Sequence, residues 1–258
     1  LSVNSSIKES LLENFYCTPC DMKIIEYAMH YKANKIIKFL ILNDVEFSGD
    51  ICQQSVSIAD YDLFHFFESK MAETFHKSLL INAIGCWNSE LTEYALNNYE
   101  NCSFFDNPGS EIEDQEFFFD IFQKSLLYLN FTFIRSILFP FLRENDKFVN
   151  ENINRLVCLS FSEGSCFFTR EFCKNPNFDA NYFFEDRKYS IIGKAIDENN
   201  IDAFELLMSR DEINVNKPAL KYFTPLTMAC GRYSDIKFVK LLCNHPKIEL
   251  KVKSDLNH

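Results

Sequence analysis

The sequence predicts an all-α protein, a solenoid of about seven helical hairpins with little or no β-strand. Three short segments, at 174–181, 209–216 and 244–251, align without gaps, and each starts 35 residues after the last. Each follows an apolar stretch of helical period, and a second such stretch lies upstream of each. The 258 residues include only 6 glycines and 7 prolines, which argues against a turn-rich all-β domain.

Each predicted hairpin pairs a small residue on its first helix with a bulky residue twelve or thirteen positions later on its second helix. A small residue is expected where two backbones approach closely, and a bulky one where the second helix fills the groove against the next hairpin. Ala95 is too small for that role, so we expect Leu96 to replace it. The pairs are Ala28 with Leu40, Ser55 with Phe67, Ala83 with Ala95, Ser125 with Ile137, Ser160 with Phe172, Ala195 with Leu207, and Ala229 with Leu242.

The chain divides into three stretches of one continuous solenoid. Residues 1–100 are predicted to hold short, degenerate units behind a cap helix at 5–16, which has a serine at its N-cap and an apolar face. Residues 101–118 form an acidic, irregular insertion that breaks the period. We interpret it as a surface loop leading into an acidic first helical turn, with a dedicated docking loop as the alternative. Residues 119–258 return to repeats of about 35 residues.

The last hairpin carries the most specific motif, TPLTMA at 224–229 followed by IKFVKLLC at 236–243. It resembles an ankyrin repeat, whose consensus opens with T-P-L-H-x-A and continues to a second helix of V-V-K-L-L type. The INVN stretch at 213–216 is similar to the D-V-N segment that begins the ankyrin finger. Thr227 stands where that family usually has histidine.

The resemblance is specific over 190–253, weaker over 119–189, and limited to the size pattern over 21–100. It is closest in kind to the divergent ankyrin-like repeats expanded in some AT-rich unicellular eukaryotes. Tetratricopeptide repeats have a similar period, but the polar connector before Thr224 is too long for them. The resemblance implies a concave surface, built from first helices and fingers, that binds other proteins.

Two connecting segments, 182–189 (the first finger) and 217–223 (the second finger), place aromatic residues beside basic ones. These residue types dominate the binding energy of protein interfaces, and the positive charge favours an acidic partner. The alternative is that Phe183 and Phe223 pack onto the stack itself. The candidate partner-binding residues are Tyr182, Phe184, Arg187, Lys188, Lys217, Lys221 and Tyr222.

The charge balance excludes other kinds of partner. With 26 Lys+Arg against 37 Asp+Glu, the net charge is −11, which is unsuited to nucleic acid. No apolar run approaches the 18 or so residues of a membrane span, so we expect no membrane insertion. Ten cysteines in so apolar a chain, without a secretory signal pattern, indicate reduced thiols and a cytoplasmic or nuclear protein. We expect a monomer that binds a partner protein.

One motif suggests chemistry, the C-x-x-C at Cys17 and Cys20 before a predicted helix. This is the redox spacing, and it resembles the thioredoxin active-site tetrapeptide. That fold needs a preceding strand, whereas residues 5–16 predict a helix. We therefore expect no enzymatic activity, no cofactor and no metal site. A thiol redox protein using these two cysteines and a structural spacer within a longer chain are the alternative functions.

Overall fold

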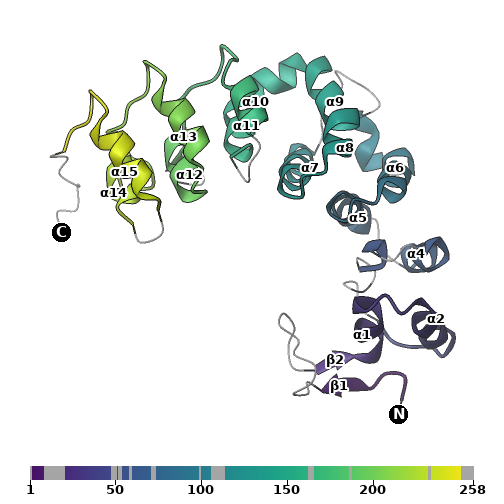
Figure 1. Ribbon diagram of the computed structural model, residues 1–258. Coiled ribbons are helices and arrows are strands. Elements are labelled where there is room, and N and C mark those ends of the chain that lie inside the picture. Colours follow the sequence, from purple (N-terminus) through teal and green to yellow (C-terminus); the bar gives the residue numbers. More distant parts are fainter. Residues whose placement is uncertain are drawn as a thin grey trace. The chain divides into compact units, whose positions relative to one another are not determined.

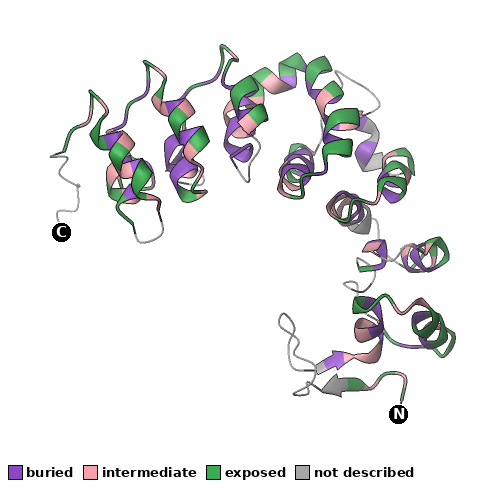
Figure 2. Ribbon diagram, viewed as in Figure 1, coloured by how far each residue is buried: buried purple, intermediate pink, exposed green. Residues whose placement is uncertain are grey.

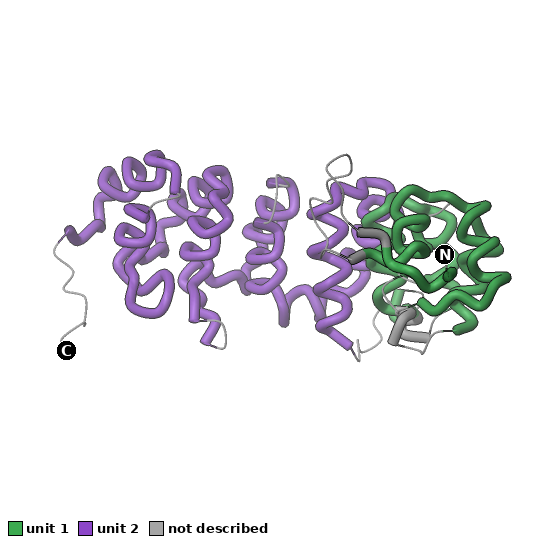
Figure 3. The backbone as a smooth tube through the Cα atoms, turned by 90° about the horizontal axis from the view of Figure 1, so that it is seen from below, with its two compact units in different colours: residues 1–106 green, residues 107–258 purple. Residues whose placement is uncertain are grey.

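The computed structural model is predominantly helical, as the sequence predicts (Figure 1). It forms two compact units, residues 1–106 and residues 107–258 (Figure 3). The structure describes residues 2–8, 21–47, 51, 54–57, 60–70, 74–98, 100–105, 114–161, 166–185, 188–231 and 234–250.

The first unit consists of paired helices behind a short β-hairpin. Helix α1 packs on α2, η1 packs on α4 and α5, and α5 packs on α6. The elements are β1 (Ser6–Lys8), β2 (Asp21–Lys23), α1 (Ile24–His30), α2 (Asn34–Leu42), the 3₁₀ helix η1 (Ser55–Ser57), α4 (Tyr61–Glu68), α5 (Thr74–Gly85), α6 (Ser89–Asn98) and the 3₁₀ helix η2 (Glu100–Phe105).

The helix predicted at 5–16 is wrong at its start, where residues 6–8 form strand β1. This strand pairs antiparallel with β2, with Ser6 opposite Lys23, and the Ile24 amide donates to the Ser5 carbonyl at 3.1 Å. The backbone groups of 6–8 thus find partners beyond their own segment, which local periodicity does not register. Residues 9–20, with Cys17 and Cys20, lie outside the described residues.

The second unit stacks its helices in two layers. Helices α10, α12 and α14 contact one another in sequence, and α11, α13 and α15 do the same beside them. The elements are α7 (Gln115–Leu127), α8 (Phe131–Phe133), the π-helix η3 (Ile134–Leu138), α9 (Phe139–Glu144), α10 (Asp146–Leu159), α11 (Cys166–Phe172), β3 (Phe183–Phe184), β4 (Tyr189–Ser190), α12 (Ile191–Asp197), α13 (Ile201–Met208), α14 (Pro225–Ala229) and α15 (Ile236–Cys243).

The segment 101–118 is less irregular than predicted. Its first residues belong to η2, and its last ones begin α7. The Asp114 carboxylate caps α7 by accepting from the Phe117 amide at 2.9 Å, and Glu116 lies in the first turn. Acidic side chains are favourable at that end of a helix, so the acidic first helical turn is present as predicted. Residues 106–113, where the surface loop is predicted, lie outside the described residues.

The small residues of the predicted register are all buried, with exposed fractions of 0–3%. Figure 2 shows buried residues in purple on the helices of both units. Two of the bulky positions need correction. Leu138 is buried instead of the half-buried Ile137, because the π-helix η3 holds an extra residue per turn and shifts the register by one. In the third hairpin Ala95 is itself buried, whereas Leu96 is half-buried.

A repeated turn joins the two helices of several pairs. The residue four positions after the small one has positive φ, and the next amide donates back to the small residue's carbonyl, which ends the first helix. These bonds join Ala33 to Ala28, Asn88 to Ala83, Asn130 to Ser125 and Asn200 to Ala195, after the positive-φ residues Lys32, Trp87, Leu129 and Asn199.

An Asn or Asp caps the second helix of five pairs, a regularity absent from our sequence prediction. Each side chain accepts a backbone N–H two or three residues further on, satisfying a group that the helix leaves unpaired. The spacing of five or six residues after the small position would have identified these caps. They are Asp60, Asn88, Asn130, Asn200 and Asp235.

Candidate partner-binding site

The two fingers of the second unit contact each other directly. Strands β3 and β4 form an antiparallel hairpin, with Phe183 opposite Ser190. The Ser190 amide donates to the Ala219 carbonyl, and the Lys221 amide donates to the Lys188 carbonyl, both at 2.9 Å. The second finger is therefore fastened to the first by main-chain hydrogen bonds.

Each finger ends in a residue whose hydroxyl caps the following helix, and the two capping residues lie 34 positions apart in the sequence. The Ser190 hydroxyl accepts from the Gly193 amide at 3.2 Å and starts α12. The Thr224 hydroxyl accepts from the Thr227 amide at 3.3 Å and starts α14, with Pro225 at the first helical position. Thr227, at the position of the family's histidine, donates its hydroxyl hydrogen to the Thr224 carbonyl at 2.9 Å.

At Gly193 the second finger approaches α12 closely. A Cβ at this position would lie 2.1 Å from the Ala219 carbonyl oxygen. No side chain fits there, because the obstructing group is backbone and cannot move away by rotation. The glycine thus determines how closely the second finger lies against α12.

Asparagine side chains link consecutive connectors on the approach to the fingers. The Asn181 amide donates to the Glu212 carbonyl and accepts from the Asn214 amide, at 2.8 and 2.7 Å. Asn216, 35 residues on, makes the same two contacts with Lys247 and Glu249, at 2.7 and 3.0 Å. This asparagine ladder, Asn181 and Asn216, holds adjacent connectors in a constant register.

The first finger separates two cavities. Successive side chains of an extended strand point to opposite sides. Phe183 and Glu185 accordingly line one cavity, of about 330 Å³, while Tyr182 and Phe184 line the other, of about 280 Å³. We call the first the lysine cavity, after Lys217 and Lys221, and the second the glutamate cavity, after Glu116 and Glu151.

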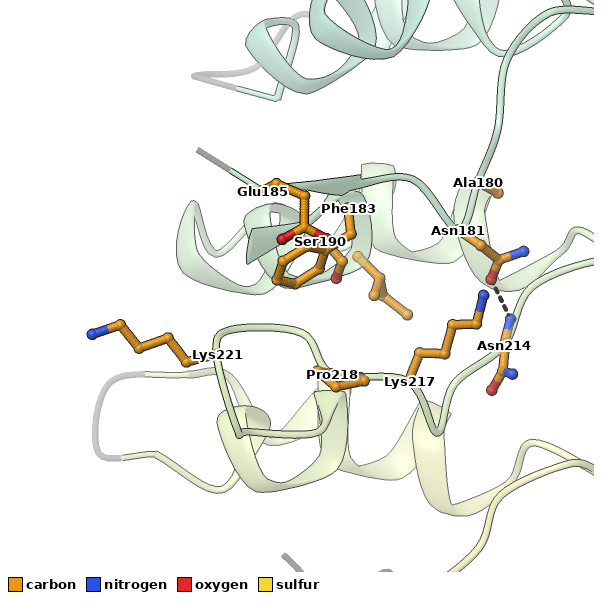
Figure 4. Close-up of a pocket in the computed structure, with 10 residues that line it drawn as sticks. Ala180, Asn181, Phe183, Glu185, Ser190, Asn214, Lys217, Pro218 and Lys221 are labelled. Atoms are coloured by element: carbon orange, nitrogen blue, oxygen red, sulfur yellow. Dashed lines mark hydrogen bonds between the residues drawn. The ribbon is translucent and has the colours of Figure 1, made fainter. Parts of the chain in front are cut away.

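The lysine cavity is rich in hydrogen-bond donors (Figure 4). The ammonium groups of Lys217 and Lys221 and the Asn214 side-chain nitrogen make no ion pair or hydrogen bond with any described residue. Glu185 lines the same cavity, but its carboxylate lies 3.8 Å from the Lys188 ammonium. An acceptor bearing negative charge would complement this arrangement.

The glutamate cavity combines aromatic rings with acidic groups. The Arg155 guanidinium lies 3.8 Å from the centre of the Phe119 ring and is bound through both terminal nitrogens by Glu116. Its positive charge is thereby neutralised. Glu151 is exposed and makes no ion pair with any described residue.

Lys194 of α12 shows how a cation near the fingers is neutralised. Burial lowers the pKa of its ammonium, but the hydrogen bond to Glu198 and the charges of Glu198 and Asp197 outweigh burial and raise the pKa overall. Lys194 therefore stays charged and paired. Among the described residues near the fingers, Lys217 and Lys221 are cations without an ion-pair partner that can meet a partner protein.

The structure places the predicted binding residues on both sides of the first finger. Tyr182 and Phe184 line the glutamate cavity, Lys217 and Lys221 line the lysine cavity, and Tyr222 is 66% exposed. Lys188 is exposed beside Glu185, and Arg187 lies outside the described residues.

The alternation of side chains along a strand could have predicted that Tyr182 and Phe184 lie on one side of the first finger and Phe183 on the other. Nothing in the sequence placed Glu151 beside Tyr182. Phe183, the residue considered for packing onto the stack, is half-buried in the lysine cavity, and Phe223 is 50% exposed.

Other kinds of site receive no support from the described part of the chain. Within it, no cluster of three or more His, Cys, Asp or Glu residues could hold a metal ion. The described cysteines are free thiols, at 86, 102, 158, 166, 173, 230 and 243. None of the described helices has the length and apolar character needed to cross a membrane.

Comparisons with known families, curated proteins and solved structures return no match for this sequence.

Proposed function

We propose that this chain is a divergent ankyrin-like repeat protein whose role is to bind a partner protein, without catalysis. In this proposal about seven repeats form one continuous solenoid, and the protein acts as a monomer in the cytoplasm or nucleus. The paired and stacked helices, the repeated turn and the asparagine ladder support the repeat architecture. The TPLTMA motif and its Thr224 cap support the resemblance to ankyrin.

The main support for the binding function is the exposure of large aromatic side chains and unpaired lysines on the two hydrogen-bonded fingers. Tyr182 and Tyr222 are 40% and 66% exposed, and both lie close in sequence to a lysine of the candidate set. Aromatic side chains of this kind lose little conformational entropy when a partner covers them. A structural spacer would have no use for them at these positions.

A photo-crosslinking amino acid at Tyr222 tests this proposal. The benzophenone side chain of p-benzoylphenylalanine replaces one aromatic with another, so the fold is expected to persist. We expect a discrete crosslinked protein in an extract of the source cell. The same substitution at Tyr128, which is 41% exposed but lines neither cavity, is the matched control.

The binding residues are tested by a variant with Tyr182, Arg187, Lys221 and Tyr222 changed to alanine. Tyr182, Lys221 and Tyr222 are exposed, and exposed positions contribute little to stability, so we expect an unchanged circular dichroism spectrum and melting temperature. The crosslinked partner should no longer be retained. Equal crosslinking from Tyr222 and Tyr128, or full retention by the variant, would place the binding surface elsewhere.

A further inference from the structure

The two cavities that flank the first finger differ in charge. Among the described residues, the lysine cavity is lined by the unpaired cations Lys217 and Lys221 and by one acid, Glu185, which lies beside Lys188. The described lining of the glutamate cavity has two acids, Glu116 and Glu151, and one cation, Arg155, which Glu116 already binds. Opposite charges are thus presented on the two sides of one short hairpin.

We propose that the first finger selects a partner segment carrying charges of both signs. An acidic side chain enters the lysine cavity, and a basic side chain lies in the glutamate cavity. This inference rests on the proposed protein-binding function and specifies the chemistry of the partner at that same site. The segment crosses the finger in one direction, because reversing it would place like charges together.

The lysine cavity suits a carboxylate in particular. The Lys217 ammonium, which points toward Asn181 and Asn214, and the free Asn214 amide nitrogen supply donors (Figure 4). The Lys221 side chain runs the opposite way and adds positive charge at the edge of the cavity. Phe183, Ile192 and Pro218 supply an apolar wall. Hydrogen bonds from cationic donors to a carboxylate are among the stronger polar contacts. The apolar wall accommodates the methylene groups of an aspartate or glutamate, or an adjacent apolar residue.

The glutamate cavity suits an ammonium or guanidinium group. A cation there would lie near Tyr182 and Phe184, whose rings are in mutual contact, with centres 4.9 Å apart in an edge-to-face arrangement. Aromatic faces attract cations, and the unpaired Glu151 adds a compensating charge. Because Glu116 neutralises Arg155, that arginine does not repel the incoming cation.

A library of random 12-residue peptides displayed on phage, panned against the whole 258-residue chain, tests the inference. We expect the selected peptides to carry an acidic and a basic residue in one constant order. Their affinities, measured by fluorescence polarisation, should fall about tenfold or more with K217E/K221E and with E151K. The matched controls are K240E on α15 and E205K on α13, exposed charge reversals that line neither cavity and should leave affinity nearly unchanged.

A second variant separates charge from folding. Lys221 has a positive φ of 48°, a conformation that glycine adopts without a steric penalty. K217A/K221G should therefore melt no earlier than the wild type while also losing affinity, by less than K217E/K221E, which adds repulsion to the loss of attraction.

Two negative results have different meanings. If peptides bind the wild type but the cavity variants affect affinity no more than the controls, the charge inference is overturned and the binding function survives. If no peptide binds the wild type better than it binds a Y182A/Y222A variant, both proposals fail.

Discussion

Single residues determine how closely the fingers pack, and Gly193 has the most restrictive position. Its Cα faces the Ala219 carbonyl, and the Ser190 hydroxyl binds both its amide and, at 3.4 Å, that same carbonyl. The first turn of α12 is therefore tied to the second finger at one point. Adding atoms at this point displaces backbone, which is costlier than moving a side chain.

We predict that Gly193→Ala destabilises the protein by about 1–3 kcal/mol, because the new methyl group must push the second finger away from α12. Urea unfolding followed by circular dichroism measures this change. Asp197→Ala on the same helix is the control, since Asp197 is exposed and its ion pair with Lys194 is long, at 3.6 Å. A Gly193→Ala variant as stable as the control would contradict the close approach.

The buried Cys173 thiol is expected to react slowly with alkylating reagents. Burial raises its pKa from the ordinary 9.0 to about 11, against a smaller lowering by the Arg210 charge. The thiolate is the reactive form, so at pH 8 its population should fall about 100-fold relative to an ordinary cysteine. We expect iodoacetamide to label the exposed Cys230 and Cys243 long before Cys173 in native protein.

Mass spectrometry of tryptic peptides measures this order of labelling. Unfolding in urea should remove the difference, because burial is its cause. Rapid labelling of Cys173 in the folded protein would show that its thiol is not buried.

At the scale of elements, hydrogen bonds from asparagine side chains join consecutive connectors between hairpins. Asn216 binds both the carbonyl of Lys247 and the amide of Glu249, so one amide group satisfies two backbone groups of the next connector. An amide is needed because the position requires both a donor and an acceptor. The same geometry at Asn181 explains the 35-residue spacing of the two asparagines.

We predict that Asn216→Ala costs about 0.5–1.5 kcal/mol, since water replaces part of the lost hydrogen bonding at this half-buried site. Hydrogen exchange should accelerate at the Glu249 amide, which loses its acceptor. Asn216→Asp retains an acceptor for that amide but no donor for Lys247, so Glu249 should stay protected. Equal exchange at Glu249 in both variants would contradict the ladder.

At the scale of the whole molecule, the division into two compact units has a consequence for folding. Both cavities and both fingers lie entirely within residues 107–258. That unit holds its own buried aromatic core, including Phe118, Phe122, Phe168 and Phe204. Units with their own core commonly fold alone.

We predict that the fragment 107–258 folds by itself, with helical circular dichroism and a cooperative thermal transition. It should bind the selected peptides as tightly as the whole chain does. An unfolded fragment would show that the first unit is required for stability, and a folded fragment that fails to bind would place part of the site outside it.

We predict that the ten cysteines are reduced in the native protein. Thiol counting in denaturant without reductant should return close to ten if the protein resides in a reducing compartment. A count near zero would contradict the proposed cytoplasmic or nuclear location.

Much of the fold was predictable from sequence because its determinants are local. The small residues from Ala28 to Ala229 occupy close helix contacts, where size alone selects Ala or Ser, so their spacing reveals the helix pairs. The cap at Thr224 and the following proline likewise act within one turn of helix. The aromatic and basic residues of the fingers could be recognised by their types, and strand alternation predicts their division between two faces. The distant residues that line each face could not be predicted in this way.

Only the tertiary structure decided the features that depend on segments far apart in the chain. Strand β1 exists because residues 6–8 meet residues 21–23, and the π-helix η3 shifts the bulky position from Ile137 to Leu138. Glu151 of α10 reaches the first finger about 30 residues later, creating a cavity that no local pattern encodes. Local preferences determine which helices form, whereas the pairing of distant surfaces determines where charges meet.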